Sequence, residues 1–177
     1  ANLADAVATV RDERARGVLV AFAGRVWAGA ELRKMHTYRA DAFDAGDAGP
    51  LALIEEGLLR WLREPLRGEA LGLARIARDA ALWPRVEIVM SHAGASGALV
   101  DALAAQGVQG IVAAGTGNGT LHRDVEAALL RAQSAGVAVV RSTRCAAGPV
   151  IGQTLLRCAG VLSPVQARLE LMLELMA

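Results

Sequence analysis

The sequence predicts an α/β fold whose second half is built on a parallel sheet. From residue 86 onward, short apolar runs of strand length alternate with longer segments in which apolar residues recur at helical spacing. Glycines stand at the ends of several of these segments. Hydrophobic residues make up 54% of the 177-residue chain, which is enough for a sizeable core. Strands that alternate with helices imply parallel strands joined by right-handed crossovers.

The chain opens with a predicted helix. Asn2 is expected to cap it and Gly17 to end it, with Leu3, Val7 and Val10 on its apolar face. The chain starts with Ala1 rather than Met and shows no signal peptide, so we expect it to begin within a larger fold.

A hairpin is expected after this helix. Residues 18–22 and 26–28 are apolar runs of strand length on either side of an Ala-Gly-Arg turn. Residues 31–50 are polar and have no periodicity, and such a run between ordered elements often carries function. Residues 51–84 are expected to form a connector with weak helical character that contains the boundary between two lobes.

Regular patterning begins after Pro84. Residues 86–90 are predicted to form a strand. Ser96 would cap the next helix, which carries Leu99 and Leu103 and ends at Gly107.

The second half is centred on residues 107–120. Apolar residues 111–114 are predicted to form a strand, which leads into a turn with glycine at positions 115, 117 and 119. These glycines permit positive φ and a close approach of the backbone to a small ligand, and sites tend to lie at the carboxyl ends of parallel strands. The same glycines could simply turn the chain, and their spacing differs from the dinucleotide fingerprint Gly-x-Gly-x-x-Gly. The helix that follows is expected to bury Leu121, Val125, Ala128, Leu129 and Ala132.

The end of the chain predicts one more strand and one more helix. Residues 137–140 form the strand, which continues into the polar residues 141–144. Ser163 is the expected cap of the last helix, with Pro164 at the first helical position and Gln166 completing a capping box. The predicted buried stripe of this helix comprises Val165, Leu169, Met172, Leu173 and Met176.

Composition argues against several classes of protein. The net charge is +1, and no basic stripe with interleaved aromatics appears, so no nucleic-acid partner is expected. No apolar run approaches the roughly 20 residues that span a bilayer. Cys145 and Cys158 are expected to be small core residues, because two cysteines make neither a disulfide framework nor a zinc site. His36, His92 and His122 lack metal-ligand spacing, so no metal or cofactor is expected.

Four stretches match the motifs of one family in that family's order. Residues 34–37 (Lys-Met-His-Thr), followed by Phe43 and Gly-Pro-Leu at 49–51, form the first, with Met35 replacing a usual Thr and Ala52 a usual Gly. The others are Gly-Ile-Val-Ala-Ala-Gly-Thr-Gly-Asn-Gly at 110–119, Val-Val-Arg-Ser-Thr-Arg at 139–144 and Gly-Val-Leu-Ser-Pro-Val-Gln-Ala-Arg at 160–168. Together they resemble bacterial L-asparaginases.

The resemblance covers only the second half of such an enzyme. It implies that residues 1–62 are the end of the N-terminal lobe, residues 63–84 an inter-lobe connector and residues 85–177 a Rossmann-like C-terminal lobe. The family's Thr-Gly-Gly-Thr and Thr-Asp-Thr motifs, which hold the nucleophilic Thr and its neighbours, do not occur in this chain. The N-terminal half of the enzyme is therefore expected to be missing.

The resemblance implies hydrolysis of the side-chain amide of L-asparagine, with L-glutamine as a second candidate substrate. The reaction would pass through a Thr acyl-enzyme whose nucleophile lies outside this chain. Lys34 matches the Lys of the family's Thr–Lys–Asp group, in which a buried Lys can relay a proton. Without the resemblance, Lys34 would be interpreted as a solvated residue beside Arg33.

Thr120 stands where family members often have an Asn near the substrate of a neighbouring subunit. It is a candidate for substrate binding, and a helix cap is the equally plausible alternative. Family members also often supply a Glu from the loop after Arg-Ser-x-Arg, whereas residues 146–156 hold no Glu or Asp. Asn118 is interpreted as a turn residue rather than a ligand contact.

Two other functions stay open at this point. The turn at 115–119 could bind phosphate or a nucleotide, with Arg141 recognising a 2′-phosphate, although this leaves Lys34 unexplained. The chain could also be a non-catalytic assembly lobe. The family resemblance implies a homo-oligomer built as a dimer of dimers, and it leaves the compartment open between cytoplasm and periplasm, with the cytoplasm slightly favoured.

Overall fold

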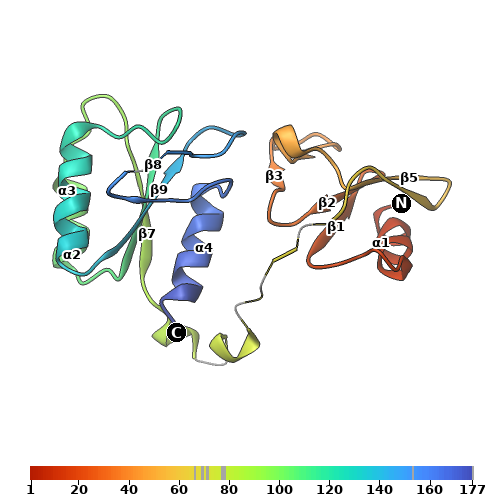
Figure 1. Ribbon diagram of the computed structural model, residues 1–177, viewed down its shortest axis with the longest axis horizontal. Helices are drawn as coiled ribbons and strands as arrows, with labels where there is room; N and C mark the ends of the chain where they lie inside the picture. Colours follow the sequence, from red (N-terminus) through yellow and green to blue (C-terminus); the bar gives the residue numbers. More distant parts are fainter. Residues whose placement is uncertain (66, 69, 71, 77–78, 153, 177) are drawn as a thin grey trace. The chain divides into compact units, whose positions relative to one another are not determined.

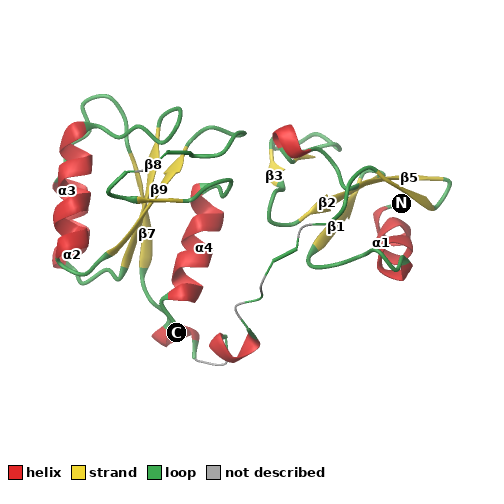
Figure 2. Cartoon of the chain, in the orientation of Figure 1, coloured by secondary structure: helices red, strands yellow, loops and turns green. Residues whose placement is uncertain are grey.

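A computed structural model describes the whole chain except residues 66, 69, 71, 77–78, 153 and 177. The chain divides into two compact units, Ala1–Ala70 and Leu71–Ala177 (Figure 1). Both units mix helices and strands, as Figure 2 shows by colour. Part of the predicted connector at 63–84 lies outside the described residues. None of the described helices is long and apolar enough to cross a membrane.

The described part of the first unit contains one α-helix and an antiparallel sheet. Helix α1 (Asn2–Arg11) is followed by strands β1 (Leu19–Phe22), β2 (Arg25–Ala28), β5 (Ala52–Glu55) and β6 (Leu58–Trp61), which lie in the sheet in this order. Strands β3 (Arg33–Lys34) and β4 (Phe43–Asp44) pair separately, and the 3-10 turn η1 (Gly46–Ala48) follows them. The buried hydrophobic residues described in this unit are Val26, Trp27, Ala28, Ala42, Leu51 and Ala52.

Strands β1 and β2 confirm the predicted first hairpin. Ala23 and Gly24 form its turn at φ 51° and 70°, the conformation that suits a two-residue hairpin. Strands β5 and β6 form a second hairpin around Glu56 and Gly57, at φ 50° and 77°. The prediction of weak helical character for residues 51–84 was therefore wrong in this part. The reason is that apolar runs on both sides of a two-residue turn pair as strands.

Helix α1 is shorter than predicted. It ends at Arg11 rather than at Gly17, because the Asp12 carboxylate accepts hydrogen bonds from the Arg14 N–H and from Nε1 of Trp61 (2.9 and 3.1 Å). A side chain that bonds backbone groups in this way competes with helix continuation. Asn2 does not cap the helix, and its carboxamide oxygen accepts instead from the N–H of Ala23 (3.1 Å).

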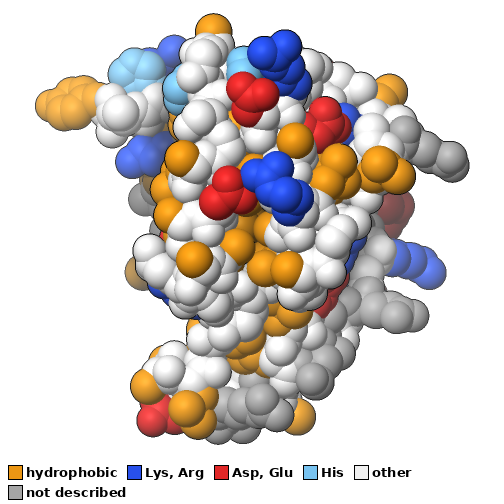
Figure 3. Space-filling model, turned by 90° about the vertical axis from the view of Figure 1, so that its left-hand side faces the viewer, with side chains coloured by type: hydrophobic (Ala, Val, Ile, Leu, Met, Phe, Trp, Pro, Cys, Tyr) orange, Lys and Arg blue, Asp and Glu red, His pale blue; other side chains and the backbone are white. Residues whose placement is uncertain are grey.

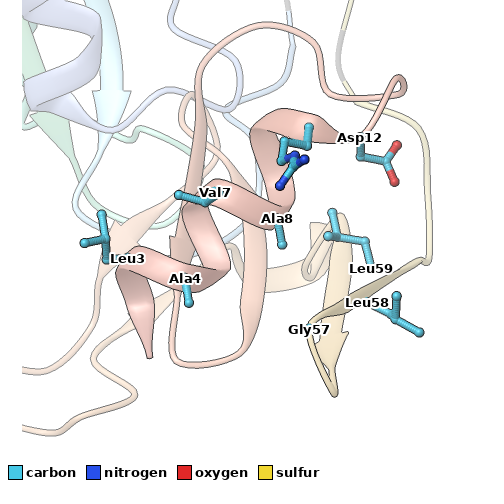
Figure 4. Close-up of a pocket in the computed structure, with 9 residues that line it drawn as sticks. Leu3, Ala4, Val7, Ala8, Asp12, Gly57, Leu58 and Leu59 are labelled. Atoms are coloured by element: carbon cyan, nitrogen blue, oxygen red, sulfur yellow. The ribbon is translucent and has the colours of Figure 1, made fainter.

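The predicted apolar face of α1 faces solvent in this chain. Leu3 and Val10 are 80% and 76% exposed, and Val7 is 47% exposed. Part of this face borders an open hollow of about 690 Å³ between α1 and the turn that leads into β6 (Figure 4). Leu58, on the far side of the hollow, is also exposed. The first unit therefore carries an apolar surface that no described segment of it covers.

The second unit is built on a parallel sheet. Its strands are β7 (Val86–Met90), β8 (Gly110–Gly115), β9 (Ala138–Thr143) and β10 (Arg157–Cys158), in the spatial order β10-β9-β8-β7. Helices α2 (Ala98–Ala105) and α3 (Arg123–Ser134) cover one face, and α4 (Pro164–Glu174) covers the other (Figure 1). The 3-10 turns η2 (Leu73–Arg75) and η3 (Ala80–Leu82) precede β7. The predicted α/β class and parallel sheet are confirmed.

Two apolar clusters hold the helices of the second unit to the sheet. Residues of β8 alternate between them, so Ile111 and Ala113 pack under α2 and α3 while Val112 packs under α4. The predicted stripe of α3 is buried at Val125, Ala128, Leu129 and Ala132. Figure 3 shows acidic and basic side chains next to one another on the outer side of the second unit. Arg131 of α3 and Asp101 of α2 form an ion pair at 2.9 Å.

Helix α2 departs from its predicted start. Gly97 is its N-cap and makes no side-chain cap bond, so Ser96 does not cap it. Gly97 is required for packing, because a Cβ there would lie 2.7 Å from Cβ of Ala128 on α3. Leu103 is buried as predicted, whereas Leu99 is 55% exposed.

Helix α4 starts as predicted, but its buried face matches the predicted stripe only in part. Ser163 and Gln166 form the full capping box, with Pro164 at the first position. Val165 and Leu169 are exposed, so the predicted stripe was wrong at these positions. Met172 of the predicted stripe is buried on the sheet side, and so is Met176 just beyond the helix, while Ala167 and Leu171 are buried there without having been predicted.

The two cysteines are not core residues, which corrects another prediction. Cys145 follows the end of β9 and is exposed, and Cys158 in the edge strand β10 is half-buried. Loop and edge positions leave a side chain in contact with water on at least one side.

Candidate active site

Lys34 lies at the end of β3 in the first unit. Its Cα pairs with that of Phe43 in β4, and its side chain is exposed. The ring of Phe43 meets that of Phe22 in β1 edge to face, with centroids 5.0 Å apart, which ties the small hairpin to the main sheet. Among the 19 Lys and Arg residues of the chain, Lys34 is the single lysine. It is therefore the only basic side chain, apart from histidine, that can readily give up its proton.

The loop after Lys34 is held by its own backbone and by one histidine. Met35 and His36 both donate their N–H to the carbonyl of Ala42, at 2.7 and 3.3 Å. Nδ1 of His36 accepts the N–H groups of Tyr38 and Arg39, each at 3.1 Å. In the neutral ring this places the proton on Nε2.

An ion pair between Arg39 and Asp41 lies further along this loop. The Arg39 guanidinium donates to both carboxylate oxygens of Asp41, at 2.9 and 2.6 Å. This hydrogen bonding lowers the pKa of Asp41 below its usual value, and the positive charge of Arg39 acts in the same direction. Both side chains are exposed, so the pair shapes the loop more than it stabilises the unit.

Lys34 borders a small open hollow of about 260 Å³, together with Met35, His36 and Thr37. The neighbouring Gly-Pro-Leu segment is anchored by Arg63, which forms an ion pair with Glu31 and donates to the carbonyl of Gly49 at 2.9 Å. The motif residues of the first unit thus lie on one ordered stretch of chain rather than on a loose loop.

The second unit presents its own candidate edge, where β7, β8 and β9 all end. Ser91 follows β7, is 2% exposed, and its Oγ accepts the N–H of His122 at 2.8 Å. The glycine-rich turn follows β8. Thr143 ends β9, and its Oγ1 donates to the carbonyl of Gly117 at 2.6 Å. Carboxyl ends of parallel strands converge at one edge, so these residues surround a common surface.

Thr120 closes the glycine-rich turn. Its N–H and carbonyl exchange hydrogen bonds with Thr116, at 2.8 and 2.9 Å, and the residue is exposed. The cap of α3 is His122, whose Nδ1 accepts the N–H of Asp124 at 3.3 Å. The helix-cap alternative for Thr120 was therefore wrong, and its role in binding substrate stays a prediction.

Arg141 is not placed as the nucleotide-binding interpretation requires. It is 9% exposed, and its Nη2 donates to Sγ of Cys158 at 3.2 Å. Its Nε has no hydrogen-bond partner among the described residues. A guanidinium buried in this way does not reach out to a phosphate above the turn.

Lys34 belongs to the first unit and Thr120 to the second. No group of three or more His, Cys, Asp or Glu residues that could hold a metal occurs among the described parts of the chain. The sequence patterns gave no structural role to His36, Ser91 or Thr143. The available signal was local: a hydroxyl side chain at the end of a strand or directly after it, and a histidine two residues before the turn that it holds.

Comparison with known families assigns both units. The Glutaminase/Asparaginase C-terminal domain profile matches residues 85–177, and the Asparaginase N-terminal profile matches residues 1–67. The chain belongs to the glutaminase/asparaginase family, which confirms the resemblance.

Individual relatives agree with this assignment. L-asparaginase 2 of Escherichia coli (strain K12) is 34% identical over 98% of this chain and 53% of the relative. The glutaminase-asparaginase of Pseudomonas fluorescens biotype A is 34% identical over 83% of this chain and 41% of the relative. Among solved structures, a probable cytoplasmic L-asparaginase from Campylobacter jejuni superposes with a TM-score of 0.87 at 30% identity, over 98% of this chain and 60% of its own. The chain spans about half the length of the curated relatives it matches.

Proposed function

We propose that this chain is part of an amidohydrolase that converts L-asparagine to L-aspartate and ammonia. The observation that carries the proposal is its 34% identity with L-asparaginase 2 of Escherichia coli over 98% of the chain. L-glutamine is the second candidate substrate, because other relatives are named glutaminase-asparaginases. The division into the end of an N-terminal lobe (1–62), a connector (63–84) and a C-terminal lobe (85–177) belongs to the same proposal.

Lys34 has the role of proton relay in this proposal. A Thr hydroxyl is a weak nucleophile near neutral pH and needs a neighbour that accepts its proton. Lys34 is the single lysine of the chain and lies on an ordered hairpin, next to a hollow large enough for a small ligand.

The nucleophilic Thr would lie outside this chain. Neither of the family's Thr motifs occurs in the sequence, and the chain spans about half the length of its curated relatives. The exposed apolar face of α1 offers a surface on which further protein could pack. Thr120, exposed at the carboxyl edge of the parallel sheet, would contact the substrate of a neighbouring subunit in a dimer of dimers.

Ammonia release from L-asparagine and L-glutamine tests the proposal. A preparation with the intact mass of this chain is expected to release none by itself, and to release ammonia when it is produced together with the preceding segment of the Escherichia coli relative. Release by the isolated chain would contradict the placement of the nucleophile.

Two substitutions at Lys34 test the relay. Lys34→Arg keeps the positive charge but cannot give up its proton, whereas Lys34→Met removes both. Both variants are expected to abolish release from the complemented enzyme. Full activity in Lys34→Arg would reduce the role of Lys34 to that of a fixed charge.

A further inference from the structure

Two segments of the second unit are fastened together at the carboxyl edge of the parallel sheet. They are the glycine-rich turn at 115–119 and the loop at 144–152 that leaves β9. At the stem of the loop, the Arg144 N–H donates to the carbonyl of Gly115 at 2.9 Å. Oγ1 of Thr143 bridges the two segments, since it donates to the carbonyl of Gly117 at 2.6 Å and accepts the N–H of Cys145 at 3.0 Å.

A second pair of hydrogen bonds holds the C-terminal end of the loop. Nδ2 of Asn118 donates to the carbonyl of Ile151 at 2.9 Å, and Oδ1 of Asn118 accepts the N–H of Ile151 at 2.8 Å. One side chain thus satisfies both backbone groups of a residue 33 positions away. A carboxamide can do this at any ordinary pH, because it carries a donor and an acceptor side by side.

Close packing supports this second pair of hydrogen bonds. A Cβ at Gly119 would lie 3.0 Å from Cγ1 of Val150, the residue before Ile151, and the side chain of Val150 is 2% exposed. Val150 also forms an isolated bridge with Gly160. The crown of the loop, residues 145–147, is exposed between these two points of attachment.

We infer that Asn118 is a positioning residue, which locks the 144–152 loop onto the glycine-rich turn so that both form one preformed rim beside Thr120. This inference rests on the proposed function for its consequence, because the rim matters only if substrate binds at this edge. A rim that is ordered beforehand spares the substrate the entropy of ordering the loop. Asn118 acts through the loop and is not assigned any contact with the substrate.

Hydrogen exchange at the Ile151 amide tests the inference directly on the chain without substrate. Loss of both bonds in Asn118→Ala is expected to speed exchange at Ile151 about tenfold or more, while exchange at Val112 in the buried strand stays unchanged. Gln133→Ala is the matched control, since Nε2 of Gln133 makes one longer bond, 3.3 Å, to the carbonyl of Leu155. Gln133→Ala should leave the exchange rate of the Ile151 amide unchanged.

An Asn118→Asp variant adds a readout that simple loss of packing would not give. An ionised Asp still accepts the Ile151 N–H but cannot donate to its carbonyl, whereas a protonated Asp can do both. Protection of Ile151 in this variant, corrected for intrinsic exchange, should rise towards the wild-type level as pH falls from about 6.5 to about 3.5.

Unchanged exchange in Asn118→Ala, or a protection in Asn118→Asp that does not vary with pH, would overturn the inference. Failure of amide hydrolysis would leave these exchange results intact. If the enzyme is active but the 144–152 loop proves mobile, Asn118 has no positioning role, and the proposed amidohydrolase activity still stands. The two failures are therefore distinguishable.

Discussion

The two units of the chain use helices in different ways. In the second unit, α2 and α3 cover one face of the parallel sheet and α4 covers the other, so that β8 is buried along its whole length. In the first unit, α1 presents Leu3 and Val10 to solvent, and every residue of β1 is only half-buried. The two helices differ in burial although both α1 and α3 carry apolar residues at helical spacing.

This difference shows that a helical stripe and a buried helix face are separate properties. The stripe is set by residue spacing, whereas burial requires a second surface of matching shape. In the second unit the sheet supplies that surface for α3, and in the first unit the described residues supply none for the outer face of α1. The same contrast should appear in stability, because a substitution at a buried position costs more than one at an exposed position.

The strongest test compares the same substitution in the two helices. Leu129→Ala in α3 should lower the free energy of unfolding of the second unit by about 2–5 kcal/mol, because it leaves a cavity at a fully buried position. The Leu3 side chain in α1 is 80% exposed, so Leu3→Ala should change the free energy of unfolding of the first unit by less than about 0.5 kcal/mol. Native-state hydrogen exchange resolves each unit separately. Similar losses in both would show that α1 is covered in solution.

Glycine substitutions make a second pair. Gly115→Ala should destabilise the second unit by about 1–3 kcal/mol, because the new Cβ would lie 2.5 Å from the carbonyl carbon of Gly119. The control is Gly68→Ala in the first unit, where the new Cβ would have no heavy atom within 4 Å and φ lies outside the left-handed region. Urea unfolding of each variant measures the difference, and a neutral Gly115→Ala would mean that the turn can shift to make room.

Helix starts give a third, smaller contrast. Ser163→Ala removes the capping box of α4 and should lower stability by about 1 kcal/mol. Asn2→Ala in α1 should change stability by less than about 0.5 kcal/mol, because Asn2 makes no cap bond. Thermal unfolding followed by circular dichroism measures both. An equal loss at Asn2 would mean that its bond to Ala23 matters as much as a cap.

Acid should weaken the first unit slightly. The pKa of Asp12 is lowered by hydrogen bonds from the Arg14 N–H and from Trp61, and the pKa of Glu55 is lowered by its bonds to Arg60. A carboxyl with a depressed pKa in the folded state stabilises it above its unfolded pKa of about 4, and this contribution is lost as pH falls through the folded value. Glu55 is exposed and Asp12 is half-buried, so the effect should be small and should shrink in salt.

The acid effect is measured by exchange of first-unit amides between about pH 5 and about pH 3, which brackets the carboxyl titration. Asp12→Asn is the matched variant, because it keeps an acceptor for the Arg14 N–H but does not titrate. The stability of the first unit should depend less on pH in this variant than in the wild type. An identical dependence in the two proteins would show that Asp12 contributes nothing to it.

Several elements show how far sequence patterns reached. The capping box at Ser163 and the strands at 86–90 and 111–114 were predicted correctly, because each rests on a signal carried within a few residues. The hairpin of β5 and β6 was missed although Glu56-Gly57 stands between two apolar runs. The stripe of α4 was wrong at Val165 and Leu169, since the rotation of the helix on the sheet selects which apolar residues are buried.

The candidate site likewise combines features that the sequence predicted with features that only the structure shows. The family motifs alone singled out Lys34 and Thr120 as candidates, and these roles stay predictions. The bond pattern around them depends on long-range contacts: Asn118 reaches Ile151, and Thr143 reaches Gly117. No local pattern specifies such pairs, because their members meet only after the strands have aligned.

The sequence by itself determined the family, the α/β class, the parallel sheet and the best helix start, because spacing, capping residues and motif order act over short stretches of chain. The tertiary structure alone decided that the apolar face of α1 is exposed, that both cysteines lie outside the core and that the loop after β9 is clamped to the glycine-rich turn. These outcomes depend on which surfaces meet, and that is settled by packing across the whole unit rather than by any single segment.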